Sequence, residues 1–142
     1  MKTFFVCCAL FGSLLATIAL PAQAQTDTPP ATETAPKPLL AEPKVQSVFD
    51  TLMGAIEDNS YTSFLTVVDD DFKAVLTKPL FESVVKQVAP RQKKGYEPTY
   101  FGSINRQGYR VHFWKLVFND KDDDLLAELA LKDEKVGGFM LR

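Results

Sequence analysis

The sequence has very few of the side chains that most often bind metals or attack substrates. Its only cysteines are Cys7 and Cys8, and its only histidine is His112. A multi-histidine metal site is therefore excluded. Both cysteines lie in an apolar run near the start of the chain, so a chain without that run has no thiol for disulfides, catalysis or metal binding. Hydrophobic burial must then hold the fold together.

Strong net charge and nucleotide-binding motifs are also missing. Sixteen basic residues stand against eighteen acidic ones, a formal net charge of −2, which gives no general electrostatic reason to bind nucleic acid or an anionic membrane. The sequence shows no phosphate-binding glycine loop, no Ser-His-Asp arrangement and no internal repeat. We therefore expect no cofactor, no metal and no nucleic-acid partner.

The start of the chain has the pattern of an export signal. Lys2 precedes an apolar run over residues 4–20, and Ala22-Gln23-Ala24 is the small-x-small pattern that signal peptidases cut. We predict that residues 1–24 are a signal peptide, that the protein is periplasmic or secreted, and that it has no membrane contact after cleavage. The alternative is a retained anchor, although this run is short for a hydrocarbon core of about 30 Å.

Residues 25–43 are rich in proline and threonine and contain almost no large apolar residue. This composition disfavours helix and sheet and cannot bury enough surface to offset chain entropy. We expect a disordered tether, with a PxxP recognition peptide as the alternative. The prolines are Pro29, Pro30, Pro36, Pro38 and Pro43.

From residue 44 onward the spacing of apolar residues becomes helical. Residues 44–57 carry one continuous apolar stripe. Ser60 is a suitable N-cap for a second, shorter helix, and Thr77 for a third helix that Pro90 should kink or end. The sequence therefore predicts three helices. Arg91, Lys93 and Lys94, which come next, are typical of a helix C-terminus, and an anion-binding patch is the alternative interpretation.

Beyond Gly95 the period changes from helical to strand-like. Residues 109–118 read YRVHFWKLVF, ten residues crowded with aromatic and β-branched side chains. Turn-forming residues separate this strand from its neighbours. We predict an α+β domain over residues 44–142, with three N-terminal helices packed on a curved four-stranded antiparallel meander. The predicted strands are 96–104, 109–118, 125–131 and 136–141.

Two acidic runs match cation sites only in part. Residues 69–71 are adjacent aspartates, which point in different directions on any regular backbone, and a solvated turn or a helix cap is the better interpretation. Asp120, Asp122 and Asp124 have the alternating spacing that opens an EF-hand loop. Leu125, however, stands where that loop requires glycine. We interpret this second run as a solvated hairpin turn.

Alternation along residues 109–118 places Tyr109 on one face of the strand and His112 and Trp114 on the other. His112 is a weak candidate for a catalytic base, because the sequence identifies no partner to orient it. Tyr100, Tyr109 and Trp114 are the predicted ligand-binding residues, since phenol and indole groups give an apolar wall polar hydrogen-bonding groups. Plain packing is the alternative for all of them.

Several short features together resemble one known superfamily. They are an aromatic residue at the start of the second helix (Tyr61), the pair Asp71-Phe72, the step Val75-Leu76-Thr77 and the pair Gly95-Tyr96. Over residues 44–142 the chain resembles the nuclear transport factor 2-like (cystatin-like cone) superfamily, and in particular small exported bacterial members of unknown function. The resemblance implies an apolar pocket between helices and sheet, used by some members for isomerase or hydrolase chemistry and by many for binding or dimerisation. It implies no catalytic residue.

We therefore expect an exported, non-enzymatic domain that binds a small apolar ligand or a partner protein through a sheet face or cavity, with a homodimer through the sheet as a variant. The rival is a small isomerase- or hydrolase-like enzyme with His112, Asp50 or Asp71 as base. A cavity lined by both His112 and a carboxylate favours the enzyme. A lining of apolar side chains and tyrosine hydroxyls favours binding.

Overall fold

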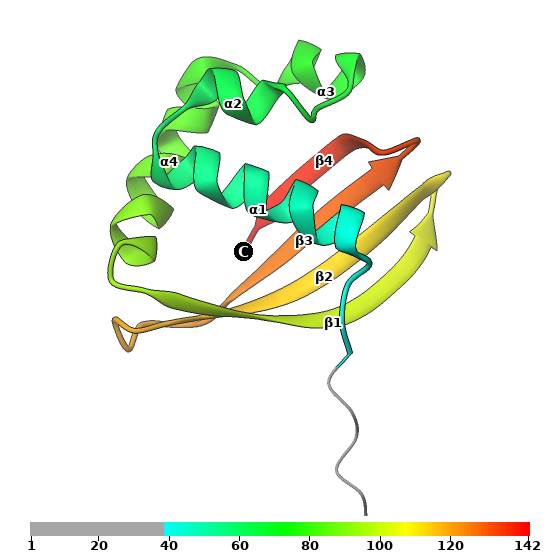
Figure 1. Ribbon diagram of the computed structural model, residues 1–142. Coiled ribbons are helices and arrows are strands. Elements are labelled where there is room, and N and C mark those ends of the chain that lie inside the picture. Colours follow the sequence, from blue (N-terminus) through cyan, green and yellow to red (C-terminus); the bar gives the residue numbers. More distant parts are fainter. Residues whose placement is uncertain (1–38) are drawn as a thin grey trace, which may run out of the picture. The chain divides into compact units, whose positions relative to one another are not determined.

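The computed structural model describes residues 39–142, in which helices come first and strands follow (Figure 1). The predicted signal peptide over residues 1–24 and the first part of the predicted tether, residues 25–38, lie outside the described residues. The predicted α+β class and the four-stranded antiparallel sheet are confirmed. Within residues 39–142, the helices are too short or too polar to cross a membrane.

Two predicted N-caps begin helices. The side-chain oxygens of Ser60 and Thr77 accept the backbone N–H groups of Ser63 and Leu80, which satisfies amides that have no partner inside the helix. Pro90 lies inside the last helix, which continues for two further residues. The helices are α1 (Pro43–Glu57), α2 (Tyr61–Leu65), α3 (Asp70–Val75) and α4 (Lys78–Gln92).

The acidic run over residues 69–71 begins a helix, which is why the described residues contain four helices where the sequence predicted three. Asp69 is the N-cap of α3, and its carboxylate accepts the N–H of Phe72 at 2.7 Å. Asp70 and Asp71 follow in the first turn, where negative charge interacts favourably with the helix dipole. The interpretation of this run as a helix cap is therefore confirmed.

The sheet is an antiparallel meander in the order β1-β2-β3-β4. Two irregularities interrupt its ladders, one on β1 between Tyr100 and Gly102 and one where Gly137 of β4 has no partner opposite. Extra residues of this kind increase local twist. The strands are β1 (Tyr96–Arg106), β2 (Tyr109–Phe118), β3 (Leu125–Lys132) and β4 (Lys135–Leu141).

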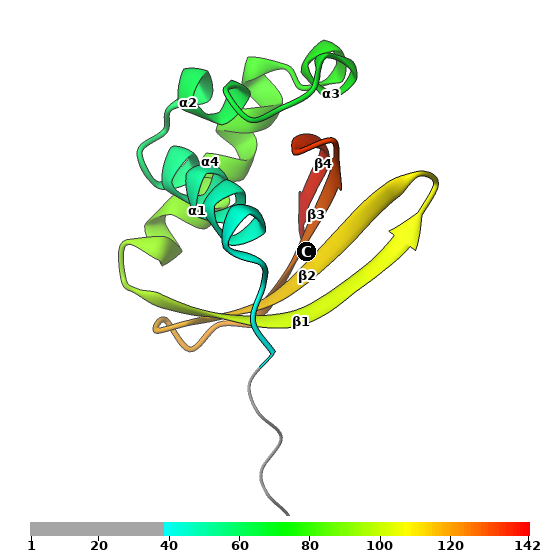
Figure 2. The same cartoon turned by 45° about the vertical axis from the view of Figure 1, so that its right-hand side comes forward.

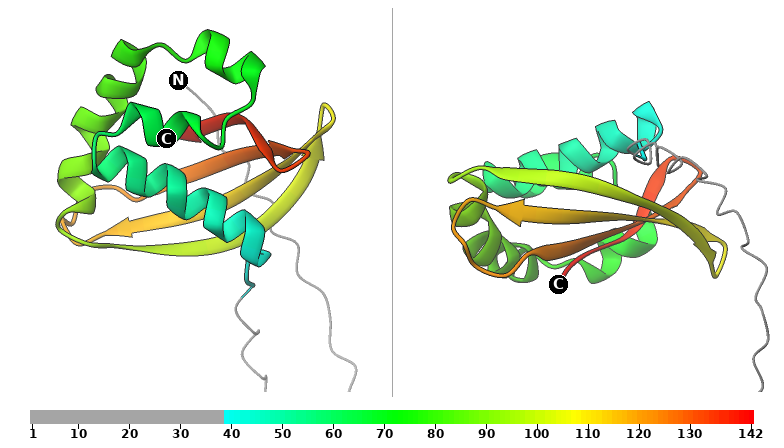
Figure 3. Two further views of the ribbon diagram at one scale, coloured as in Figure 1. Left: turned by 45° about the horizontal axis from the view of Figure 1, so that its top comes forward. Right: turned by 90° about the horizontal axis from the view of Figure 1, so that it is seen from below.

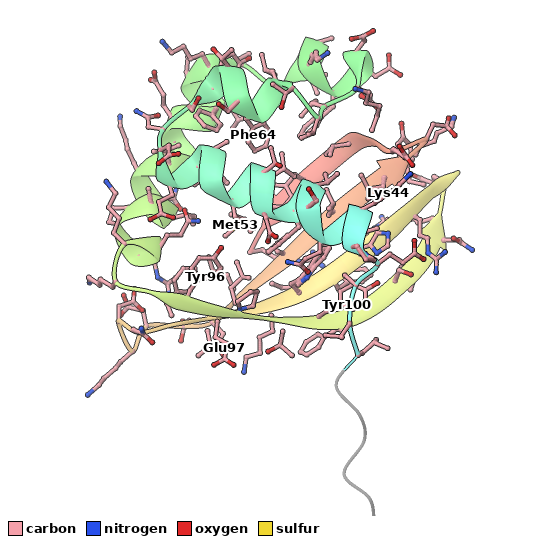
Figure 4. The ribbon with its side chains drawn as sticks, in the orientation of Figure 1. Lys44, Met53, Phe64, Tyr96, Glu97 and Tyr100 are labelled. Atoms are coloured by element: carbon pink, nitrogen blue, oxygen red, sulfur yellow. The ribbon has the colours of Figure 1, made fainter. Side chains whose placement is uncertain are left out.

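The helices cover one face of the sheet, which we call the inner face (Figure 2). Seen from below, the opposite or outer face carries no helix among residues 39–142 (Figure 3, right). Alternation along the strands sorts the side chains, so that Tyr96 points toward the helices and Glu97 points away (Figure 4). The inner face is therefore the core side.

The centre of the core is an aromatic stack between α1 and β2. The rings of Phe49 and Trp114 lie 4.3 Å apart and nearly parallel, and both side chains are almost fully buried. Trp114 Nε1 also donates a hydrogen bond to Oε1 of Gln46 on α1, at 3.4 Å. On the far side of α1, Gln92 of α4 donates to the carbonyl of Met53 at 3.0 Å. These contacts fix α1 between the sheet and α4.

An ion pair joins α4 to the turn between β2 and β3. The guanidinium of Arg91 donates hydrogen bonds to both carboxylate oxygens of Asp120, at 2.8 and 3.3 Å, and another to the carbonyl of Asp123. Its guanidinium lies 4.2 Å from the ring centre of Phe118. The hydrogen bonds from Arg91 lower the pKa of Asp120. The carboxylate that would open an EF-hand loop is thus engaged by an arginine, and the described residues contain no cluster of potential metal ligands.

We predict that Phe49→Ala lowers the free energy of unfolding by about 3–5 kcal/mol, because it removes a buried ring and leaves a cavity against Trp114. Urea unfolding followed by the fluorescence of Trp114, the only tryptophan, measures this. Val75→Ala removes an apolar side chain that is 67% exposed and should change stability by no more than about 0.5 kcal/mol. Equal effects of the two substitutions would contradict the assigned core.

Candidate functional site

An apolar groove lies along β4, between that strand and the helices. Its volume is about 300 Å³, and every side chain that lines it is apolar. Ile56, Phe64 and Phe81 are buried and form its floor, whereas Leu80 and Met140 are each 53% exposed at its lips. We call it the edge groove. Its lining residues are Ile56, Phe64, Phe72, Leu76, Leu80, Phe81, Val84, Phe139, Met140 and Leu141.

The edge groove exists because the helical layer closes only the first part of β4. The link between α2 and α3 pairs with that part: Val136 donates to the carbonyl of Val67, and Asp69 donates to the carbonyl of Val136, both at 2.9 Å. Next, α3 begins at Asp70, and its helical backbone no longer pairs with the strand. The following β4 residues therefore border the groove instead of a neighbouring strand.

Hydrogen bonding and ring packing hold the helical wall of the edge groove in place. The hydroxyl of Tyr61 donates to the carbonyl of Leu76 at 2.6 Å, which ties α2 to the start of α4. The Phe81 ring packs at 5.3 Å against Phe64 and at 5.5 Å against Tyr61. Because its hydroxyl bonds the wall itself, Tyr61 adds no polar group to the lining.

A second cavity of about 180 Å³ lies beside the N-terminal end of α1, and we call it the mouth cavity. His112 and two carboxylates, Glu42 and Glu134, line it. His112 Nδ1 lies 2.9 Å from the hydroxyl of Tyr100, whose ring stacks on the imidazole. Tyr100 is thus the orienting partner that the sequence did not identify. The other ring nitrogen has no hydrogen-bond partner among residues 39–142.

The surroundings of His112 in the mouth cavity favour its neutral form by lowering its pKa. Burial is the main cause of its lowered pKa, the nearby Arg110 lowers it further, and Glu42 opposes both. Glu134 forms an ion pair with Lys44, which lies near the N-terminal end of α1 (Figure 4). Glu42 is therefore the carboxylate of this cavity without an ion-pair partner in the described part of the chain.

The structure brings two of the three predicted ligand-binding residues together and places the third elsewhere. Tyr100 and Trp114 lie opposite each other on the inner face. Trp114 is 1% exposed and stacked on Phe49, so its indole is a core group. Tyr109 lies on the outer face, where its ring covers Gly137 so closely that a Cβ there would lie 2.1 Å from it. Alternation explains the separation, since odd and even positions of β2 face opposite ways.

The aspartates predicted as alternative bases also lie away from His112. Asp50 is exposed on α1 and accepts a hydrogen bond from Gln46, and Asp71 is exposed in the first turn of α3. Neither lines the mouth cavity. The carboxylates that do, Glu42 and Glu134, come from the segment before α1 and from the β3–β4 turn, which the sequence alone could not place beside His112.

The edge groove was also not predicted from the sequence, although its residues carry a signal. Leu80 and Val84 have the helical spacing of a buried apolar stripe, yet Leu80 is half exposed. When the apolar stripe of a helix is wider than the sheet surface that it covers, its outermost apolar residues stay partly exposed. Predicting that Leu80 is such a residue requires knowing that β4 is the edge strand beneath it.

No protein-family model matches the chain, and a search of curated proteins finds no match. The resemblance to the nuclear transport factor 2-like superfamily stays a prediction.

We predict that His112 makes the fold less stable in mild acid. Its pKa is lowered in the folded state from the ordinary 6.5, so the unfolded chain binds the proton more readily. The free energy of unfolding should keep its full value above about pH 6.5 and should decrease as the pH falls from there through the lowered pKa of His112. Urea unfolding at several pH values between about 5 and 8 should show this slope in the wild type and not in His112→Gln. Parallel slopes would contradict a buried neutral imidazole.

Proposed function

We propose that the domain is a non-enzymatic binding module and that its edge groove holds an apolar group of its ligand. The observation that carries this is the lining, since all ten side chains around the groove are apolar. Exposed apolar surface of this kind is hydrated at a cost, which an apolar ligand removes on binding. The groove supplies no acid, base or nucleophile, so its chemistry is binding.

The dimensions of the edge groove suit a small or narrow occupant. Its volume of about 300 Å³ is at the low end of the range typical for small-molecule pockets, about 300–1,000 Å³. The half-exposed Leu80 and Met140 leave it open along one side, so a longer ligand can extend beyond it. The groove could hold either a small apolar ligand or apolar side chains of a partner protein, and each agrees with the expected function of an exported binding domain.

The resemblance to the nuclear transport factor 2-like superfamily supports this proposal in general terms. It implies a pocket between helices and a curved sheet, and the edge groove lies between α2–α4 and β4. The homodimer predicted through the sheet stays a prediction. The exposed apolar side chains of Ile104 and Val117 on the outer face support it, whereas Glu97 and Lys115 on the same face are charged.

Enzymatic activity at the mouth cavity is a second candidate, because His112 and the carboxylate of Glu42 line one cavity. The Tyr100 hydroxyl orients the imidazole through Nδ1, and in the tautomer with Nδ1–H donating to that hydroxyl, Nε2 has the lone pair that a general base requires. Burial lowers the pKa of His112, which favours the unprotonated imidazole that a base needs. The cavity holds only about 180 Å³, which is small for a substrate. The edge groove is therefore the better-supported site.

We predict that the neutral dye N-phenyl-1-naphthylamine binds the edge groove. Its fluorescence should rise on titration with the wild-type protein, and Leu80→Glu should weaken binding by at least about tenfold, because it places a carboxylate at the lip of an apolar site. Leu40→Glu is the matched control, since Leu40 is 78% exposed and lies outside the groove.

Equal weakening by both substitutions would show that the dye binds elsewhere. No binding by the wild type would remove the groove as the basis of the proposed function. Circular dichroism of the two variants checks that each remains folded.

A further inference from the structure

We infer that the edge groove binds an extended peptide segment of a partner protein, which adds to the sheet as a short strand beside β4. This inference rests on the proposed function and specifies its ligand. Two separate features support it: unpaired backbone groups on β4, and depressions on both faces of that strand.

Hydrogen bonding between β3 and β4 shows which backbone groups point outward. Arg142 and Leu126 exchange both of their backbone hydrogen bonds, so they form a hydrogen-bonded pair. In an antiparallel ladder such pairs alternate with pairs whose N–H and C=O groups point away from the partner strand. Phe139 and Leu141 are therefore the residues whose N–H and C=O groups point toward the open edge.

Those outward groups have no hydrogen-bond partner among residues 39–142. Val136, which also points outward, is fully paired with the link between α2 and α3. The edge is thus closed at Val136 and open at Phe139 and Leu141. Open strand edges are templates for pairing with another extended chain.

A depression flanks β4 on each side of the sheet. The edge groove lies on the inner side, and a depression of about 350 Å³ lies on the outer side. Both are lined by Phe72, Phe139 and Met140. Because successive side chains of a strand point to opposite faces, a strand paired with β4 would place alternate side chains in the two depressions. A compact ligand would fill only one of them.

The two depressions specify the chemistry of the peptide. The edge groove is apolar throughout, so residues on that side should be large and apolar, such as leucine or phenylalanine. The outer depression contains Tyr109 and two charged groups. One of these, Glu128, forms an ion pair with Arg142, whereas Arg106 has no ion-pair partner in the described range. An acidic residue on the outer side complements Arg106.

Neither the tether nor a long strand fits this edge. Residues 25–38 include Pro29, Pro30, Pro36 and Pro38, and proline lacks the N–H that a ladder requires. The link between α2 and α3 already pairs with Val136, which limits a bound segment to the part of β4 beyond Gly137. The partner should therefore contribute a short segment, held as much by its side chains as by its backbone.

Selection of random octapeptides displayed on phage against the purified chain tests this inference. We expect enriched sequences in which large apolar residues alternate with polar or acidic ones. Added to the protein, such a peptide should slow hydrogen exchange of the Phe139 and Leu141 amides by at least about tenfold, as measured by NMR. N-methylation of one set of alternate peptide amides should weaken binding about fivefold per group, with little effect of the other set. Leu80→Glu should weaken binding, and Leu40→Glu should not.

The other outcomes separate this inference from the proposed function. If N-phenyl-1-naphthylamine binds the groove but no peptide protects Phe139 and Leu141, the peptide inference is wrong and the proposed function stands. If neither ligand binds, both are wrong. Protection that needs no peptide and rises with protein concentration would identify a second copy of the chain as the occupant and overturn the inference. Protection that disappears when residues 25–38 are deleted would overturn it in favour of the tether.

Discussion

The contact between α1 and the inner face of the sheet is the constraint from which the other features follow. Phe49 stacks on Trp114 at the middle of the sheet, and the side chains of Leu52 and Ile56 are fully buried further along the helix. This packing fills the space that a central pocket would need. Open space remains at the margins, beside the N-terminal end of α1 and beyond β4. The mouth cavity and the edge groove therefore lie where the packed core ends.

Local sequence features predicted the elements well, because periodicity and capping act over a few residues. The apolar stripe of residues 44–57 became α1, Ser60 and Thr77 became caps, and residues 109–118 became β2. The acidic run at residues 69–71 was harder to place, since aspartate is compatible with a turn or a helix start, and only the chain direction after Val68 decides between them.

The candidate site could not be predicted, because it depends on contacts between residues far apart in the chain. Alternation correctly placed Tyr109 and Trp114 on opposite faces of β2. Nothing in the sequence, however, places Tyr100 beside His112, because that contact depends on the β1–β2 register and its irregularity after Tyr100. The same holds for the edge groove. Leu80 and Leu141 meet there only because β4 is the last strand and α4 packs across its end.

Asp69 has two roles that together set how much of β4 remains uncovered. Its backbone N–H pairs with the carbonyl of Val136, and its carboxylate accepts the N–H of Phe72 and so starts α3. One residue thus ends a strand-like pairing and begins a helix. Were the helix to begin later, the parallel pairing would extend further along β4 and leave less of the edge open. The width of the opening is in this sense encoded by the position of a single capping carboxylate.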